Sequence, residues 1–229
     1  QVGHLVSRYL KNPVEVSVDS ATDTVGTMRH LFLAVHKLDK DRVIAAMAAG
    51  SGQTVVFCDT KRQCDRVERA LLDLGVNAAA IHGDLAQTSR EKALKRFEKG
   101  EINILVATDV AARGIDIDDV SLVVHYEPPI DVKNYLHRSG RTARAGEEGN
   151  VVLLSTTKSQ SGVKSLTSRA GVTPIFVHVE PMSNELIDIT GAVEPSGIPY
   201  IAPVMENKGP SRGNRRPRPN SSERRRRPR

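Results

Sequence analysis

Three arginines follow one another at intervals of three residues in the segment HRSGRTARAG, residues 137–146. If this segment were helical, Arg138, Arg141 and Arg144 would lie on neighbouring turns of one face, where like charges repel each other. The guanidinium group is planar, always charged and suited to bidentate capture of phosphate oxygens. The spacing therefore indicates a phosphate site, and a solvated basic face is the competing interpretation.

No motif in the sequence would by itself hold a nucleotide. The G-x-x-x-x-G-K-[ST] phosphate loop and an acidic magnesium box after a strand are both absent, and the glycine-rich GSGQTV at 50–55 lacks the lysine. An arginine that completes a phosphoryl-transfer site from a neighbouring module raises the rate by roughly three to five orders of magnitude. The arginines therefore suit a triphosphate that another module holds.

Three further segments place polar side chains directly after predicted strands. They are VFCDTK at 56–61, HGDLAQTSR at 82–90 and ATDVAARGIDI at 107–117. In the second, Arg90 falls in the first turn of a predicted helix, where a cation opposes the helix dipole unless an anion lies near. In the third, Gly114 allows a close turn beside several acids. Solvated loops are the competing interpretation of each segment taken alone.

Strands and helices are predicted to alternate along the chain. Short β-branched runs indicate buried strands, and amphipathic segments closed by glycine indicate helices. The alternation predicts an α/β fold with a mainly parallel sheet and helices on both faces, whose ligands lie beyond the carboxyl ends of the strands. All four polar segments should therefore share one edge. The predicted strands cover 54–58, 78–82, 102–108, 120–126 and 150–155, and the predicted helices cover 41–49, 61–74, 88–100, 109–114, the arginine segment and 158–170.

The positive charge is concentrated at the end of the chain. The formal net charge is +6, but residues 206–229 hold ten Lys/Arg and two Glu, so the remainder carries −2. Bulk charge therefore gives no support for polyanion binding by the folded part. The tail is predicted to be disordered; it could tether RNA with a steep salt dependence, or serve only solubility or targeting. Cys58 and Cys64 are expected to be reduced core residues, and no stretch is apolar enough to span a membrane.

Taken in order, the four segments closely resemble the second RecA-like domain of DEAD-box RNA helicases, in superfamily 2. VFCDTK resembles motif IV, HGDLAQTSR the element after it, ATDVAARGIDI motif V and YLHRSGRTARAG motif VI. The resemblance points to a bacterial RhlE-like member and implies a three-layer RecA-like domain over 27–172. Residues 1–26 resemble the end of the first domain and the linker, 173–205 would form a C-terminal extension, and 206–229 a disordered Arg-rich tail. Ala143 stands where the family usually has glycine, with no expected loss of function.

On the nucleotide side, the resemblance implies that Arg141 and Arg144 are arginine fingers that reach the phosphates of ATP. Asp116 would contact the ribose, and His137 and Arg138 would couple the ATP site to the RNA site. The family's first domain holds ATP with Mg²⁺, so no metal ligand is expected in this chain. The implied partners are RNA and that first domain; no membrane is involved, and no oligomer is implied.

On the RNA side, the resemblance implies that Thr60, Gly83, Arg90, Thr108 and Gly114 grip the sugar-phosphate backbone. Such contacts position the strand without reading its sequence, and contacts to 2′-hydroxyls favour RNA over DNA. Aromatic residues make up 3% of the chain and the motifs offer no stacking platform, so base stacking is not expected.

The implied function is that of the C-terminal domain of an ATP-dependent RNA helicase, which unwinds short duplexes locally in the cytoplasm and is inactive as an ATPase alone. An ATP-independent RNA-binding or chaperone module is an alternative of a different class, and the retained Arg141, Arg144 and Asp116 argue against it. A DNA-directed superfamily 2 translocase is a further alternative, which His137 at the start of motif VI disfavours because related groups often have glutamine there. A phosphate loop and a D-E-A-D box upstream would decide between them.

Overall fold

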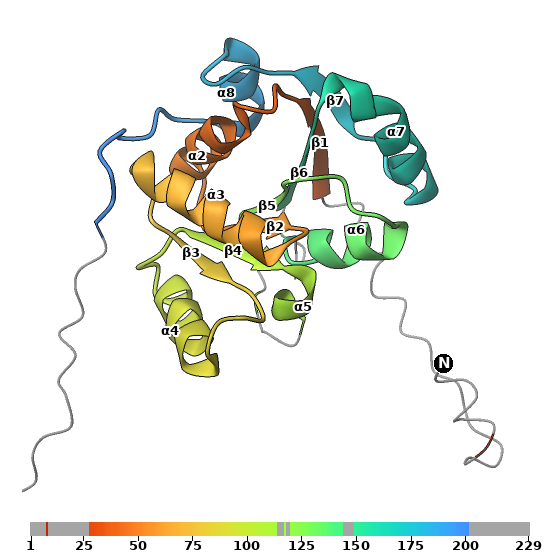
Figure 1. The fold of residues 1–229 in the computed structure, drawn as a ribbon. Coiled ribbons are helices and arrows are strands. Elements are labelled where there is room, and N and C mark those ends of the chain that lie inside the picture. Colours follow the sequence, from red (N-terminus) through yellow and green to blue (C-terminus); the bar gives the residue numbers. More distant parts are fainter. Residues whose placement is uncertain (1–7, 9–27, 114–116, 118–119, 144–148, 202–229) are drawn as a thin grey trace, which may run out of the picture.

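The domain is built on a parallel sheet with the strand order β3-β4-β2-β5-β6-β1-β7 (Figure 1). The computed structural model describes Arg8 and residues 28–113, 117, 120–143 and 149–201. The strands are β1 (Met28–Ala34), β2 (Thr54–Cys58), β3 (Ala78–Ile81), β4 (Ile104–Thr108), β5 (Leu122–His125), β6 (Gly149–Ser155) and β7 (Ile175–His178). The helices are α2 (Lys40–Gly50), α3 (Lys61–Asp73), α4 (Gln87–Glu98), α5 (Asp109–Ala112), α6 (Val132–Ser139), the 3-10 helix η2 (Thr157–Ser159), α7 (Gln160–Arg169) and α8 (Asn184–Thr190).

Helices cover both faces of the sheet and give the domain three layers (Figure 1). On one face, α2, α3 and α8 bury side chains such as Val43, Val67 and Leu186 against the strands. On the other face, α4, α5, α6 and α7 do the same with side chains such as Phe97 and Tyr135. Successive strand residues point to opposite faces of the sheet. Because helices cover both faces, β2 is buried along its whole length. The predicted α/β fold, with a parallel sheet between two helical layers, is confirmed.

The strand β1 lies outside the predicted elements, and so do β7 and α8, which extend the packed domain at its C-terminal side. β7 pairs with β1 at one edge of the sheet, and α8 buries Leu186. The chain then runs across α2 and α3, where the Val193 N–H donates to the Ala46 carbonyl at 2.9 Å and the Tyr200 N–H donates to the Leu72 carbonyl at 2.8 Å. The chain from residue 175 to residue 200 is therefore held against the sheet and its helices.

The two cysteines are buried free thiols, which confirms their expected place in the core. A hydrogen bond with Cys64 and burial raise the pKa of the Cys58 thiol above its ordinary value. Cys58 therefore stays protonated, and a protonated thiol is neither a good nucleophile nor a metal ligand. Of the helices in the described part of the chain, none has both the length and the hydropathy needed to cross a bilayer.

The turn after α6 leaves no room for a side chain at Gly149. A Cβ atom there would lie 2.2 Å from Thr142 Oγ1 and 2.7 Å from the backbone nitrogen of Ala143. Gly149→Ala should therefore lower the free energy of unfolding by about 1–3 kcal/mol in urea titrations. The matched control is Gly162→Ala inside α7, where a Cβ would meet nothing within 4 Å, so alanine should stabilise the domain by up to about 1 kcal/mol. Equal stability of the two variants would contradict this packing.

Ala143 has a φ of 56°, in the left-handed region that favours glycine. A side chain there costs about 1–2 kcal/mol. Against this, the buried methyl group contributes about 0.8 kcal/mol, and glycine would lose roughly 0.5–1 kcal/mol of additional backbone entropy on folding. The opposing contributions nearly cancel, so alanine is compatible with a turn in which related sequences usually have glycine.

Candidate functional site

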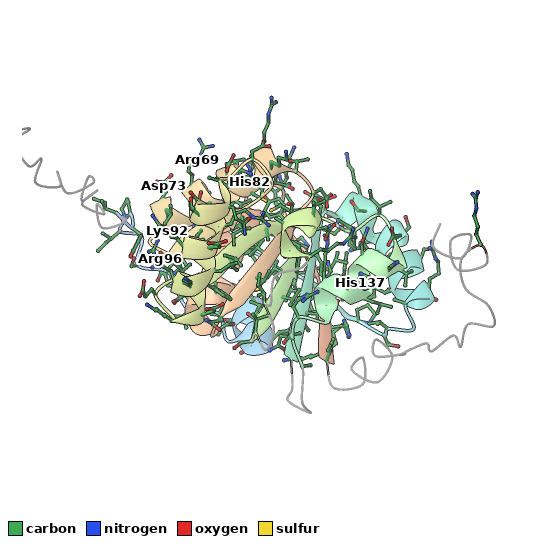
Figure 2. All side chains as sticks on the ribbon, turned by 90° about the horizontal axis from the view of Figure 1, so that it is seen from below. Arg69, Asp73, His82, Lys92, Arg96 and His137 are labelled. Carbon is green, nitrogen blue, oxygen red and sulfur yellow. The ribbon has the colours of Figure 1, made fainter. Side chains whose placement is uncertain are left out.

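The polar segments meet at the carboxyl edge of the sheet in two groups. The strand order sets the ends of β3, β4 and β2 side by side, and Gly83, Thr108 and Thr60 follow or end these strands. The arginine helix α6 follows β5, which lies on the other side of β2. Figure 2 shows the separation, because His82 after β3 lies well away from His137 on α6. The edge thus has one half that carries the RNA candidates and another that carries the ATP candidates.

The helix α6 ends before the second arginine of its segment. Asp131 caps the first turn by accepting a backbone hydrogen bond of 2.7 Å, and Gly140 is the C-cap. Arg141 lies in the turn beyond, where its N–H donates to the carbonyl of Arg138 at 3.3 Å. The expectation that these arginines share one helical face is therefore wrong for Arg141, because the helix stops at the glycine.

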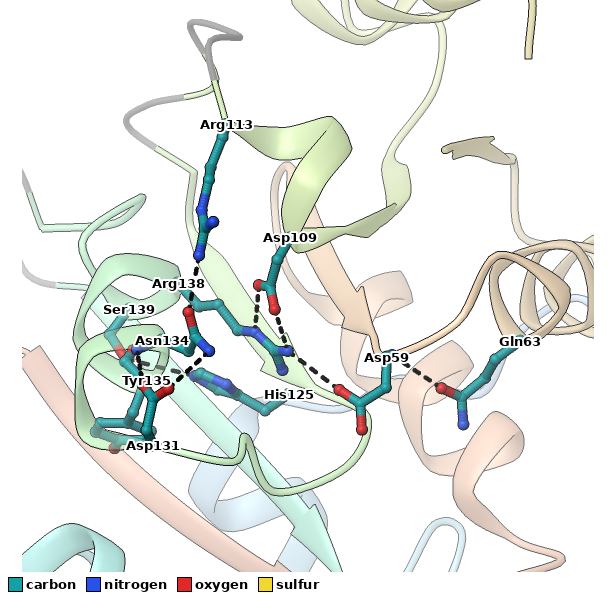
Figure 3. A network of polar contacts seen from close by, with 10 residues as sticks. All are labelled: Asp59, Gln63, Asp109, Arg113, His125, Asp131, Asn134, Tyr135, Arg138 and Ser139. Atoms are coloured by element: carbon teal, nitrogen blue, oxygen red, sulfur yellow. Dashed lines mark hydrogen bonds and ion pairs between the residues drawn. The ribbon is translucent and has the colours of Figure 1, made fainter. Parts of the chain in front are cut away.

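Arg138 is buried and held by two carboxylates (Figure 3). Its Nε and Nη2 donate to the two carboxylate oxygens of Asp109 at 2.6 and 2.7 Å, and Nη2 also donates to Asp59 Oδ1 at 3.1 Å. The guanidinium carbon lies 5.5 Å from the centre of the Phe57 ring. Burial disfavours the charge, but the hydrogen bonds that Arg138 donates to Asp109 and Asp59 outweigh it and raise the pKa of Arg138. Arg138 therefore ties α6 to the ends of β2 and β4.

Arg141 borders a small pocket beside this ion pair. The pocket has a volume of about 30 Å³, room for about one water-sized group, so a nucleotide would have to lie across its mouth. On its rim, Arg113 donates to Asn134 Oδ1 at 2.9 Å. Asp116 and Arg144 lie outside the described residues. The pocket is lined by Phe57, Asp109, Ala112, Arg113, Asn134, His137, Arg138 and Arg141.

His137 lines the same pocket from an exposed position on α6. Partial burial, followed by the positive charges of Lys133, Arg113 and Arg141, lowers the pKa of His137. The imidazole is therefore neutral at pH 7 and offers one donor and one acceptor. Beyond partial burial, the positive charges of Lys133, Arg113 and Arg141 contribute to the shift, and such charges suit an anionic ligand.

A stack of buried polar groups joins α6 to the sheet. The Tyr135 hydroxyl lies 2.7 Å from Nδ1 of His30 on β1, and its ring stacks on His125 of β5 with centroids 5.0 Å apart. Ser139 Oγ donates to the Tyr135 carbonyl at 2.8 Å and lies 3.4 Å from His125 Nε2 (Figure 3). Sequence analysis did not predict these residues as part of a site, since the two histidines come from different strands and share no motif.

The buried histidines make the stability of the domain depend on pH. Burial lowers the pKa of His30 to about 4, and it lowers the pKa of His125 well below 6.5. At a pH below 6.5 but above the lowered pKa values, each of these histidines is protonated in the unfolded chain and neutral in the folded domain. The free energy of unfolding therefore falls as the pH drops below about 6.5. His30 alone should lower the free energy of unfolding by about 2 kcal/mol between pH 7 and pH 5.

Urea titrations at pH 7 and pH 5 check this expectation. His30→Gln should reduce the pH dependence, and the same change at the exposed His36 is the matched control. A wild-type domain that is equally stable at both pH values would contradict the burial of neutral histidines.

On the RNA half, two threonines end or follow strands at the edge. Thr60 is exposed and caps α3, accepting a hydrogen bond from the Gln63 N–H at 3.2 Å. Thr108 ends β4 and stands directly before α5, whose first turn its side chain does not cap. Gly114 lies outside the described residues. The structure thus places both hydroxyls at neighbouring strand ends.

Arg90 joins α4 to α5 beside them. Its Nη1 donates to Gln87 Oε1 at 3.0 Å, and its Nη2 donates to the Ala111 carbonyl at 3.4 Å. The N-cap of α4 is Ala86, so this helix begins without a side-chain cap and its first N–H groups are not taken by one. Gly83 is exposed just before this helix. These groups therefore stand at a helix N-terminus that suits an anion.

The carboxylates next to the pocket do not form a metal site. Within residues 28–113, 117, 120–143 and 149–201, no group of three or more His, Cys, Asp or Glu side chains could hold a metal ion. Asp59 and Asp109 are both engaged by Arg138. Mg²⁺ binds carboxylate and phosphate oxygens together with several waters, and these side chains do not fit that arrangement.

Comparison with known proteins connects this geometry to a family. Residues 38–146 match the helicase conserved C-terminal domain. The ATP-dependent RNA helicase RhlB of Xanthomonas campestris is 35% identical over 189 residues, which cover 82% of this chain and 32% of RhlB. The solved Escherichia coli DEAD-box protein SrmB, bound to regulator of ribonuclease activity A, is 30% identical, with a TM-score of 0.59 over 69% of this chain and 96% of that one.

A third comparison includes a bound nucleotide analogue. Saccharomyces cerevisiae Dbp5, solved with RNA and ADP BeF3, is 25% identical, with a TM-score of 0.70 over 83% of this chain and 51% of that one. The chain spans 28–34% of the length of the curated rice, Bacillus subtilis and Bacillus licheniformis helicases that it matches. The sheet is parallel and RecA-like, the polar segments lie along one edge, and the chain covers nearly all of the SrmB chain. This chain therefore belongs to the DEAD-box family of RNA helicases and forms the helicase C-terminal domain.

Proposed function

We propose that this domain completes the ATP site of an RNA helicase whose other domain holds the nucleotide, and that it grips RNA at the same sheet edge. The observation that carries the proposal is the difference between two neighbouring arginines. Arg138 is buried between Asp109 and Asp59, whereas Arg141 lies beyond the end of α6 and lines the pocket together with Arg113 and Arg138. In this proposal the first arginine fixes the helix and the second meets a phosphate.

In this proposal the chain's residues act by position and charge. Arg141, with Arg144, stabilises the negative charge that develops on the transferred phosphoryl group, and Asp116 binds the ribose. Neutral His137 donates or accepts one hydrogen bond at the mouth of the pocket. Mg²⁺ would bind with the phosphates on the first domain, where it neutralises charge. Because the described carboxylates beside Arg141 are held by Arg138, this chain contributes cations rather than metal ligands.

The RNA half of the edge would hold one strand by its backbone. Thr60 and Thr108 stand at adjacent strand ends, and Arg90 lies in the first turn of α4, with Gly83 close to the uncapped start of that helix. Phosphate contacts from such groups do not depend on base sequence. Gly114 would add a further backbone contact. Closure of the two domains on ATP would then bend the held strand and separate a short duplex.

The experiment compares this chain alone with the full-length protein, in which it follows a nucleotide-holding first domain. The full-length protein should hydrolyse ATP, and single-stranded RNA should stimulate the rate, whereas the chain alone should show no turnover. ATP hydrolysis by the isolated chain, or a full-length protein that RNA does not stimulate, would contradict the proposal.

We also propose that the basic tail tethers RNA. Residues 206–229 hold ten Lys/Arg and two Glu, and each phosphate contact contributes to the salt dependence of binding. Deleting 206–229 should weaken RNA binding at low salt and flatten the plot of log affinity against log salt concentration, measured by fluorescence anisotropy. An unchanged slope would remove the tail from the RNA-binding surface.

A cytoplasmic location in a bacterium is proposed as well. Its support is the pair of buried free thiols, Cys58 and Cys64, which is typical of a reducing compartment, and the similarity to bacterial RhlB and DbpA.

A further inference from the structure

We propose that the buried stack of His30, His125, Tyr135 and Ser139 positions Arg141 for phosphoryl transfer. The inference rests on the proposed role of Arg141 and adds the residues that set its place. It concerns positioning residues, since none of the four lines the pocket.

The stack fixes α6 to the sheet at two strands. Tyr135 reaches His30 on β1 through its hydroxyl at 2.7 Å and covers His125 on β5 with its ring, the two ring planes meeting at 20°. On the adjoining face of the helix, Arg138 is held by Asp109 at the end of β4. Contacts to three strands leave α6 little freedom to rotate about its axis, so they set the direction in which the chain leaves the helix.

Two hydrogen bonds join the stack to the turn that contains Arg141. Ser139 donates to the Tyr135 carbonyl from its hydroxyl at 2.8 Å, and its own carbonyl accepts from the Thr142 N–H at 3.2 Å. The Arg141 carbonyl accepts from the Val120 N–H at 3.2 Å. Because Arg141 lies only two residues beyond the last residue of α6, a rotation of the helix would move its side chain at the mouth of the pocket.

The polar character of the stack is costly for stability alone. His30 Nε2 and His125 Nδ1 are buried and have no hydrogen-bond partner among the described residues. Burying polar atoms in this way disfavours folding, and apolar side chains of similar size would fill the same space without that cost. Hydrogen bonds depend on direction and therefore select one orientation of α6. Apolar packing restricts that orientation less. The arrangement therefore favours a positioning role.

The test removes one hydroxyl from the full-length protein. Tyr135→Phe keeps the ring stacked on His125 and loses the bond to His30, so kcat for RNA-stimulated ATP hydrolysis should fall on the order of tenfold, while KM for ATP changes less than about twofold. The matched control is Tyr126→Phe, which removes a partly buried hydroxyl bonded to Asp41 and Arg66, away from α6. Its kcat should stay within about twofold of wild type.

A second background shows whether the effect passes through Arg141. In an Arg141→Ala protein, adding Tyr135→Phe should change kcat by less than about twofold, because no cation is left at position 141 to misplace. His30→Gln provides an independent variant of the same contact, and urea titration shows whether each protein is folded. Three results would overturn the inference. The first is that Tyr135→Phe lowers kcat equally with and without Arg141, and the second is that Tyr126→Phe lowers it as much as Tyr135→Phe does. The third is that neither His30→Gln nor Tyr135→Phe lowers kcat. A wild-type protein without RNA-stimulated turnover would instead refute the proposed function.

Discussion

Replacing Arg141 by alanine in the full-length protein should lower RNA-stimulated ATP hydrolysis by about three orders of magnitude. The proposed reason is electrostatic: the Arg141 guanidinium would stabilise charge that grows in the transition state, and alanine offers nothing in its place. The domain should remain folded, because Arg141 lies in a turn outside α6 and the buried anchor of that helix is Arg138. Steady-state ATPase assays and urea titrations measure the two effects separately.

The control for this substitution is Arg69→Ala. Arg69 is an exposed arginine on α3 that donates to the Asp65 carbonyl, well away from the arginine helix (Figure 2). Its loss should leave turnover unchanged. Arg141→Lys should recover only part of the lost activity, because an ammonium group cannot form the bidentate contact of a guanidinium. Wild-type turnover in Arg141→Ala would refute the role assigned to this residue.

Removing the carboxylate of Asp109 should have the largest effect on stability. Asp109→Ala leaves the guanidinium of Arg138, only 3% exposed, with the single 3.1 Å contact to Asp59. Breaking a buried pair in this way costs about 3–5 kcal/mol. Urea titration should show that loss in the free energy of unfolding, and thermal melts should show a midpoint lower by roughly 6–20 °C for a domain of this size.

Two comparisons separate this effect from the loss of any ion pair. Arg138→Met should cost less than Asp109→Ala, because the aspartates left behind are 26% and 42% exposed and can be hydrated. Asp84→Ala removes the exposed partner of Lys61 and should change stability by less than about 1 kcal/mol. If Asp84→Ala and Asp109→Ala were equally destabilising, burial of Arg138 would not be what matters.

Much of the fold followed from local patterns in the sequence. β2 occupies the predicted residues 54–58, and α3 begins after its Thr60 cap and ends before Gly75, whose φ of +84° needs glycine. Short buried strands between amphipathic helices leave few alternatives to a parallel sheet, and that topology brings the polar segments to one edge. The sequence alone therefore predicts where the site lies, but not how its side chains are arranged.

What the patterns missed depends on contacts between distant residues. β7 is largely exposed at the edge of the sheet and pairs with β1 alone among the described strands, so it lacks the continuous apolar run of a central strand. The spacing of the arginines indicated a helical face, yet Gly140 ends the helix and gives Arg138 and Arg141 different environments. The stack that joins His30 to Tyr135 spans 105 residues, a separation that no local pattern contains.

The most direct test of the account is the position of Arg141 in the closed protein. A structure of the full-length protein with single-stranded RNA and ADP with beryllium fluoride should place the Arg141 guanidinium within hydrogen-bond distance of the fluorides, with Arg138 still on Asp109. A guanidinium turned away from the bound nucleotide, or a nucleotide held without any contact from this domain, would contradict the claim that the chain completes an ATP site held by its partner domain.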